Sequence, residues 1–171
     1  IYFLKMFKKE PEALILYLCD NIDDVIKKCF QPRYKSDDFS YKCYIILSST
    51  NPYIIASFLN ADRFQNLGAE ITLPEDPDPY QLGRFVSIIS GVLDTYPDML
   101  INHCGFLSRL LHHIYNPPIG QLLNRLCKDN PKLAKLQKYL LDFGFHDIVY
   151  RELIKFKHTD YDEPAKYYSS K

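Results

Sequence analysis

The chain has 171 residues, of which 47% are hydrophobic and 25% are charged. This balance is typical of globular proteins and excludes general disorder. Because 21 Lys and Arg residues cancel 21 Asp and Glu residues, no net field favours a polyanion, and we expect neither nucleic acid nor a membrane as a partner.

The cysteines and the start of the chain indicate the compartment. The five cysteines are odd in number and form no C-x-x-C pair, which favours reduced thiols in a cytoplasmic protein, with the nucleus as the alternative. The longest apolar runs are far shorter than the ~18 residues of a membrane span. The chain begins at Ile1 without a signal-peptide pattern or an initiator Met, so we expect a fragment of a longer protein.

Prolines mark the expected helix starts, because Pro suits the first helical position and Asn is a good N-cap. In five pairs a proline follows a polar or aromatic residue, which is Asn in three of them: Glu10-Pro11, Asn51-Pro52, Tyr96-Pro97, Asn116-Pro117 and Asn130-Pro131. In the first part of the chain, apolar residues recur at helical spacing. They predict helices over residues 11–19, 23–30, 38–49, 52–60 and 62–67.

A loop rich in proline and acid, residues 73–79, separates the two halves. Beyond it, apolar residues at spacings of three and four predict four helices, over residues 82–93, 106–114, 119–126 and 133–143. We expect Gly144 to end the fourth as its C-cap, and another helix to cover 145–156. No sustained segment alternates as a strand does.

These elements predict an all-α fold. We expect residues 1–157 to form one helical-repeat domain, a right-handed α-solenoid of short helix pairs similar to HEAT or armadillo repeats. It would be the N-terminal part of a longer array. We expect the polar tail, residues 158–171, to be disordered or lightly docked.

Catalytic motifs are absent: the sequence has no nucleophile elbow, phosphate loop or Rossmann glycine cluster. His103, Cys104, His112, His113 and Cys127 are zinc-type ligands, but their spacing is wrong because adjacent residues diverge by about 100° on a helix. We therefore expect a protein that is no enzyme and has no metal or cofactor. A metal-dependent or acid/base enzyme that uses these histidines or the acidic loop is the less favoured alternative.

Three consecutive segments carry a more specific pattern. One helix ends in leucine and a proline turn, from Leu93 to Pro97; the next two hold Phe106-Leu107, Leu110-Leu111 and His113-Ile114, and then Leu122-Leu123 with Leu126. This pattern resembles the SAPS domain of helical-repeat regulatory subunits that associate with Ser/Thr phosphatases of the protein phosphatase 6 type. Tyr139, where the family tends to carry Trp, would make the chain a divergent member.

The resemblance implies a non-catalytic regulatory or scaffold subunit. Such a subunit would hold the phosphatase catalytic subunit and direct it to substrates, and further adaptor proteins are expected partners. The alternative is a generic helical adaptor that binds other proteins.

The helix expected over residues 104–114 offers candidate contact residues. Its apolar residues, Phe106 to Ile114, fall within an arc of roughly 140° that should be buried. His112 lies nearly opposite, whereas Arg109 and His113 lie just beyond one edge, where a side chain covers the core and exposes its polar end. With Arg125 on the next helix, we expect these four residues to contact the phosphatase subunit. The alternative is that they only keep the surface soluble.

Overall fold

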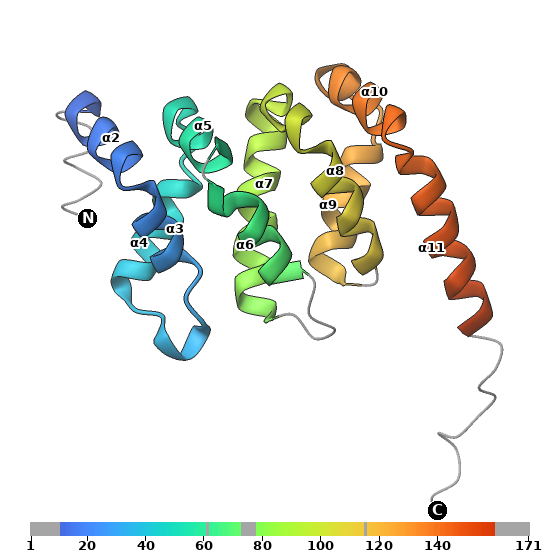
Figure 1. The fold of residues 1–171 in the computed structure, drawn as a ribbon, viewed down its shortest axis with the longest axis horizontal. Coiled ribbons are helices and arrows are strands. Elements are labelled where there is room, and N and C mark those ends of the chain that lie inside the picture. The colour runs from blue at the N-terminus through green and yellow to red at the C-terminus, as the bar shows by residue number, and fades with distance from the viewer. Residues whose placement is uncertain (1–10, 61, 73–77, 115, 160–171) are drawn as a thin grey trace, which may run out of the picture. The chain divides into compact units, whose positions relative to one another are not determined.

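The computed structural model describes residues 11–60, 62–72, 78–114 and 116–159. Within these ranges the chain is helical and contains no strand, which confirms the all-α prediction (Figure 1). The α-helices are α2 (Pro11–Asp20), α3 (Ile22–Cys29), α4 (Asp38–Leu47), α5 (Pro52–Asn60), α6 (Asp62–Thr72), α7 (Pro79–Thr95), α8 (Cys104–Arg109), α9 (Pro117–Cys127), α10 (Ala134–Asp142) and α11 (Phe145–Thr159). Four 3-10 helices complete the described elements: η1 (Arg33–Lys35), η2 (Pro97–His103), η3 (Leu110–His113) and η4 (Pro131–Leu133).

The predicted helix starts are largely correct, and two of the three asparagine caps form. Asn51 accepts hydrogen bonds from the backbone N–H groups of Tyr53 and Ile54, at 3.0 and 3.3 Å. Asn130 accepts one from Lys132 at 3.1 Å, although Pro131 begins a 3-10 helix rather than an α-helix. The Asn116 side chain makes no cap hydrogen bond, so α9 begins at its proline without the expected cap.

Some expected element boundaries differ from the structure, and α7 begins at Pro79, inside the expected loop 73–79. Helix α6 continues to Thr72 instead of ending at residue 67, because buried Ile71 extends the apolar stripe of Phe64 and Leu67 by one turn. His158 and Thr159, expected in the polar tail, belong to α11. The rest of the tail, 160–171, and loop residues 73–77 lie outside the described ranges.

The chain divides into two compact units, Ile1–Asn102 and His103–Lys171. In the first unit, α3 packs against α4, and both contact α5. Helix α6 contacts α5 before it in the sequence and α7 after it. A run of aromatic rings joins these helices: Phe58 lies 5.2 Å from Phe64, and Phe64 lies 6.0 Å from Phe85, measured between ring centroids. All three rings are almost completely buried, so they form the centre of this unit's core.

A buried arginine fastens α7 to the start of the first unit. Arg84 is 7% exposed, and its guanidinium donates hydrogen bonds to the Cys29 carbonyl oxygen at 2.5 Å and to Ser40 Oγ at 2.7 Å. The rings of Tyr80 and Tyr44 flank it, with centroids 4.3 and 5.2 Å away. Hydrogen bonds and ring contacts offset the cost of burying this charge.

The second unit has a mainly aliphatic core. Helix α8 packs against α10 and η3, α9 packs against η3, and α11 packs against both α10 and η3. The core takes Leu107 from α8, Leu110 from η3, Leu122 from α9, Leu136 from α10 and Phe145 from α11, all of them buried. Gly144 ends α10 with φ of +71°, a left-handed conformation that costs glycine little, and this confirms the predicted C-cap.

Candidate interaction site

The four residues predicted to contact a partner all lie in the second unit, on three successive elements. Arg109 is the last residue of α8, His112 and His113 belong to η3, and Arg125 lies on α9. The side chains of Arg109, His112 and Arg125 are exposed. His113 is only 9% exposed, so the expectation that it would offer its polar end to solvent is wrong.

The change from α-helix to 3-10 helix after Arg109 explains the inward position of His113. A 3-10 helix has three residues per turn, so His112 lies directly beneath Arg109 and His113 is turned away by about 120°. The prediction assumed a continuous α-helix, in which His113 would follow Arg109 instead. Arg109 and His112 therefore share the exposed face, while Leu110, Leu111 and His113 turn inward.

His112 links η3 to α11 through a carboxylate. Its Nδ1 lies 2.9 Å from Glu152 Oε1, and Lys155 Nζ donates to the same oxygen from 2.7 Å. The hydrogen bond from Lys155, and after it that from His112, lower the pKa of Glu152 below its usual value. Glu152 is therefore ionised at neutral pH and holds the two elements together.

The described residues offer no metal centre. Nowhere within the described ranges do three His, Cys, Asp or Glu side chains gather closely enough to hold an ion. His103 and His113 are both buried, and this desolvation lowers the pKa of each below 6.5, which favours the neutral ring. Their burial positions them as core residues of the second unit.

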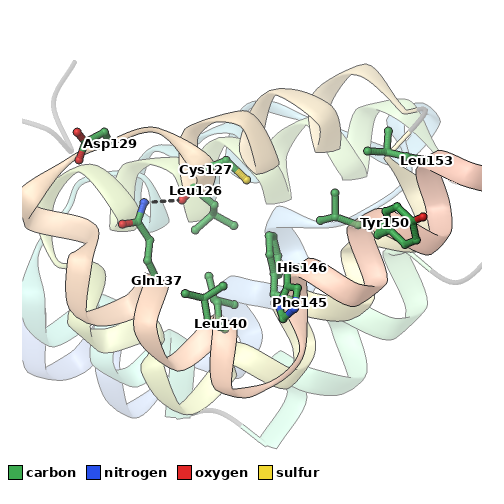
Figure 2. Close-up of a pocket in the computed structure, with 11 residues that line it drawn as sticks. Leu126, Cys127, Asp129, Gln137, Leu140, Phe145, His146, Tyr150 and Leu153 are labelled. Atoms are coloured by element: carbon green, nitrogen blue, oxygen red, sulfur yellow. Dashed lines mark hydrogen bonds between the residues drawn. The ribbon is translucent and has the colours of Figure 1, made fainter.

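An apolar groove lies between the end of α9, helix α10 and the first half of α11. Its volume is about 510 Å³, and its main apolar lining residues are Leu126, Leu140, Phe145, Val149, Tyr150 and Leu153. Figure 2 shows Asp129 and Gln137 at one end and Tyr150 and Leu153 at the other. The sequence analysis did not predict this groove.

Several large apolar side chains around the groove remain in solvent. Leu141 and Leu153 are 55% and 53% exposed, and Tyr150 is 67% exposed. Phe143, which follows α10, and Ile154 on α11 are also exposed, but neither lines the groove. Leaving such side chains in water costs free energy that a protein partner would recover, so this face has the character of a binding surface.

The groove has few polar groups to offer a ligand. The Gln137 amide nitrogen already donates to the carbonyl oxygens of Leu126 and Lys128, both at 2.8 Å. These two bonds satisfy carbonyls at the end of α9 and hold α10 against it. Asp129 is the one acidic side chain in the lining, which contains no Lys or Arg.

Cys127 places a reactive group in the lining. Its thiol is exposed, whereas the thiols of Cys29, Cys43 and Cys104 are buried and none of the four forms a disulfide. Partial burial raises the pKa of the Cys127 thiol above 9.0, so the neutral thiol predominates at physiological pH. Cys127 thus serves as a chemical reporter of whether the groove is filled.

The neutral charge of the whole chain conceals a division between the units. Residues 1–102 contain 10 Lys and Arg against 14 Asp and Glu, a net charge of −4. Residues 103–171 contain 11 against 7, a net charge of +4, and also all five histidines. The groove therefore belongs to a basic unit, although the net charge of the whole chain is zero.

The sequence contained one usable signal for the groove. Helices α10 and α11 carry apolar residues outside the stripes that they bury: Leu141 lies beside Leu140, and Tyr150, Leu153 and Ile154 lie beside the core positions of α11. An apolar face wider than a core stripe indicates a second contact surface. Which neighbour would cover that second face could not be read from the periodicity.

Comparisons of the chain with protein families, with curated proteins and with solved structures found no match. Among the described helices, none is both long and apolar enough to cross a membrane.

Proposed function

We propose that the protein is a non-catalytic regulatory or scaffold subunit that binds another protein, the catalytic subunit of a Ser/Thr phosphatase of the protein phosphatase 6 type. The observation that supports a binding function is the set of exposed apolar side chains around the α9–α11 groove. Water-exposed Leu141, Tyr150 and Leu153 have a physical reason to meet a partner, and protein interfaces gather such residues at their centres.

The identity of the partner rests on the SAPS-like pattern of residues 93–126, in which the candidate contact residues lie. Arg109 and His112 share one exposed face, and Arg125 is exposed on the next α-helix. An arginine at an interface forms forked hydrogen bonds with carboxylates and stacks on aromatic rings. We assign the phosphatase contact to Arg109 and Arg125, with His112 beside them.

The proposal includes a right-handed α-solenoid and a cytoplasmic location. Short helices that pack on their sequence neighbours, as α3, α4 and α5 do in the first unit, are what a helical repeat requires. Curved helical arrays present long surfaces, on which a catalytic subunit and further adaptor proteins find separate sites.

The experiment measures binding of the purified whole chain to a catalytic subunit of the protein phosphatase 6 type. A catalytic subunit from another Ser/Thr phosphatase class serves as the specificity control. Arg109→Glu should weaken binding about tenfold, or 1.4 kcal/mol, because it replaces the anchoring cation with a repelled anion. Helicity and melting temperature should stay nearly unchanged, since Arg109 is exposed.

Arg33→Glu is the matched control. Arg33 is also exposed but lies in the first unit, and its replacement by Glu changes the net charge of the chain by the same amount. It should bind like the unchanged chain. Equal binding of both phosphatase classes, or none of either, would contradict the phosphatase assignment and favour the generic adaptor.

A further inference from the structure

The lining of the α9–α11 groove extends over about two turns of α11. Its lining recurs on α11 at Phe145, Val149 and Leu153, which lie one turn apart on one side of that helix. Eight residue steps at 1.5 Å each span roughly 12 Å, or about two helical turns. The volume of about 510 Å³ lies within the range of roughly 300–1,000 Å³ that is usual for ligand sites. The groove therefore accommodates a row of apolar side chains.

The groove walls select the type of segment that binds. They are helices, whose backbone N–H and C=O groups bond within each helix, so no sheet edge exists for an added strand. The Gln137 amide nitrogen is already engaged with two carbonyls, and a small polar ligand would find few convergent groups. An amphipathic helix needs only apolar contacts at i, i+3, i+4 and i+7, which such a groove supplies.

The charges around the groove indicate which side chains a bound segment would carry beside its apolar stripe. Lys128 is exposed and lies in sequence between the lining residues Cys127 and Asp129, and exposed Lys138 follows the lining residue Gln137 on α10. Four acids lie in the lining or next to it in sequence: Asp129 at one end of the groove, exposed Asp142, Asp147 at 3.2 Å from His146, and Glu152, which His112 and Lys155 hold. With a net charge of +4 on residues 103–171, the field around the groove attracts anions.

We propose that the α9–α11 groove binds an amphipathic α-helix of a partner protein, with the apolar stripe of that helix in the groove and acidic residues on its flanks. The inference rests on the proposed function in that both make the protein a binding module. It adds a docking site separate from Arg109 and Arg125, and it names the chemistry of the segment that docks there. Leu141, Tyr150 and Leu153 are its apolar contacts, and Lys128 and Lys138 receive the acidic flanks.

The first test titrates the whole chain with a synthetic amphipathic peptide of about four turns that carries leucines on one face and glutamates on both flanks. A matched peptide carries lysine in place of each glutamate. The acidic peptide should bind at least about tenfold more tightly at low salt, and added salt should reduce this difference. Equal affinity for the two peptides, or no binding of the acidic one, would overturn the proposal.

The location of binding is tested with the Cys127 thiol. A neutral maleimide should modify Cys127 at least about tenfold more slowly when the acidic peptide saturates the chain. Mass spectrometry separates this thiol from half-buried Cys19 in the first unit, whose rate should not change. Binding of the peptide without protection of Cys127 would place it elsewhere and overturn the groove as the site.

Two pairs of variants compare groove residues with matched neighbours. Leu153→Ser should weaken peptide binding about tenfold, whereas Ile154→Ser, next to it and outside the lining, should change it less than twofold. Tyr150→Ser and Tyr139→Ser form a second pair, since both rings are exposed and only Tyr150 lines the groove. Equal losses within each pair would contradict the assignment. All four side chains are exposed, so each variant should fold.

The remaining outcomes separate the groove from the phosphatase assignment. If Leu153→Ser abolishes peptide binding but the chain still captures the phosphatase, with loss on Arg109→Glu, both proposals stand as separate sites. Phosphatase capture without peptide binding would overturn the groove proposal alone. Peptide binding without phosphatase capture would overturn the phosphatase assignment alone. Sedimentation that shows a dimer abolished by Leu153→Ser would mean that a second copy fills the groove, and would overturn the proposed occupant.

Discussion

The two units of this protein treat their apolar side chains differently. The first joins its helices through a run of buried rings and closes them with Arg84. Its exposed large apolar side chains are mostly tyrosines, with Leu16 and Phe39 as the exceptions among the described residues. The second exposes Leu141, Phe143, Leu153 and Ile154, which have no polar end. It also carries the basic charge and every histidine. We therefore expect the first unit to contribute mainly stability, and the second to carry the proposed binding sites and the pH dependence.

The strongest test of this comparison removes a ring from the first core. Phe85 is fully buried, with ring centroids of Phe64 and Phe30 at 6.0 and 6.1 Å. Phe85→Ala should lower the free energy of unfolding by about 4 kcal/mol through lost burial and the cavity left behind. Urea denaturation measures the loss, and hydrogen exchange should assign it to residues 11–102. A loss spread equally over both units would show that they do not act separately.

Removing the arginine fastening should cost somewhat less. Arg84→Met keeps most of the side-chain volume but leaves the Cys29 carbonyl and the Ser40 hydroxyl without their buried donor. We expect a loss of about 3 kcal/mol in the urea-derived free energy of unfolding. Arg84→Lys keeps the charge but loses the planar guanidinium that contacts the Tyr44 and Tyr80 rings. Its free energy of unfolding should lie between those of Arg84→Met and the unchanged chain. If Arg84→Met were as stable as the unchanged chain, the guanidinium would contribute no net stability.

Alanine substitutions at two glycines should have smaller effects on stability, and the two effects should be opposite in sign. Gly144 in the second unit has φ of +71°, so Gly144→Ala should cost about 1 kcal/mol in left-handed strain. Gly83 lies within α7 of the first unit, and an added methyl would meet nothing within 4 Å. Gly83→Ala should therefore stabilise by about 0.5–1 kcal/mol. Thermal melts of the two variants should shift in opposite directions, and a shared direction would contradict these backbone assignments.

The mildest perturbation is pH, and it should act on the second unit. Burial lowers the pKa of His103 and of His113, the latter also through His112, below 6.5. As pH falls through 6.5, the unfolded chain therefore binds protons that the folded chain does not, and the free energy of unfolding should decrease. The lowered pKa of Glu152 acts only at more acidic pH, where protonation of that carboxylate removes further stability.

The measurement is the urea midpoint by circular dichroism at about pH 7.5 and about pH 5.5, on either side of the ordinary histidine pKa. The midpoint should be lower at the acidic pH, and a chain with both His103→Leu and His113→Leu should show less of this change. A midpoint that does not move between the two pH values would contradict the assigned cause.

Part of the fold could be predicted because its signals are local. Proline at the start of α5 and α9, glycine at the end of α10 and apolar spacing of three and four are written into each segment. The predicted elements were wrong where contacts with neighbouring helices change the local backbone conformation. Helix α8 was expected to continue to residue 114, but it tightens into η3 after Arg109, where η3 packs against α9 and α11. The change from about 3.6 to three residues per turn turned His113 inward and placed His112 against Glu152.

The sequence by itself determined that the described chain is all helical, roughly where most helices begin, and most of the leucines that they bury. Those features follow from backbone preference and from the periodicity of single segments. Only the tertiary structure decided that Arg84 would be buried between two tyrosines, that the charge would divide at Asn102, and that α9, α10 and α11 would leave an apolar groove. The physical reason is that burial and cavities depend on which segments meet, and periodicity describes one segment at a time.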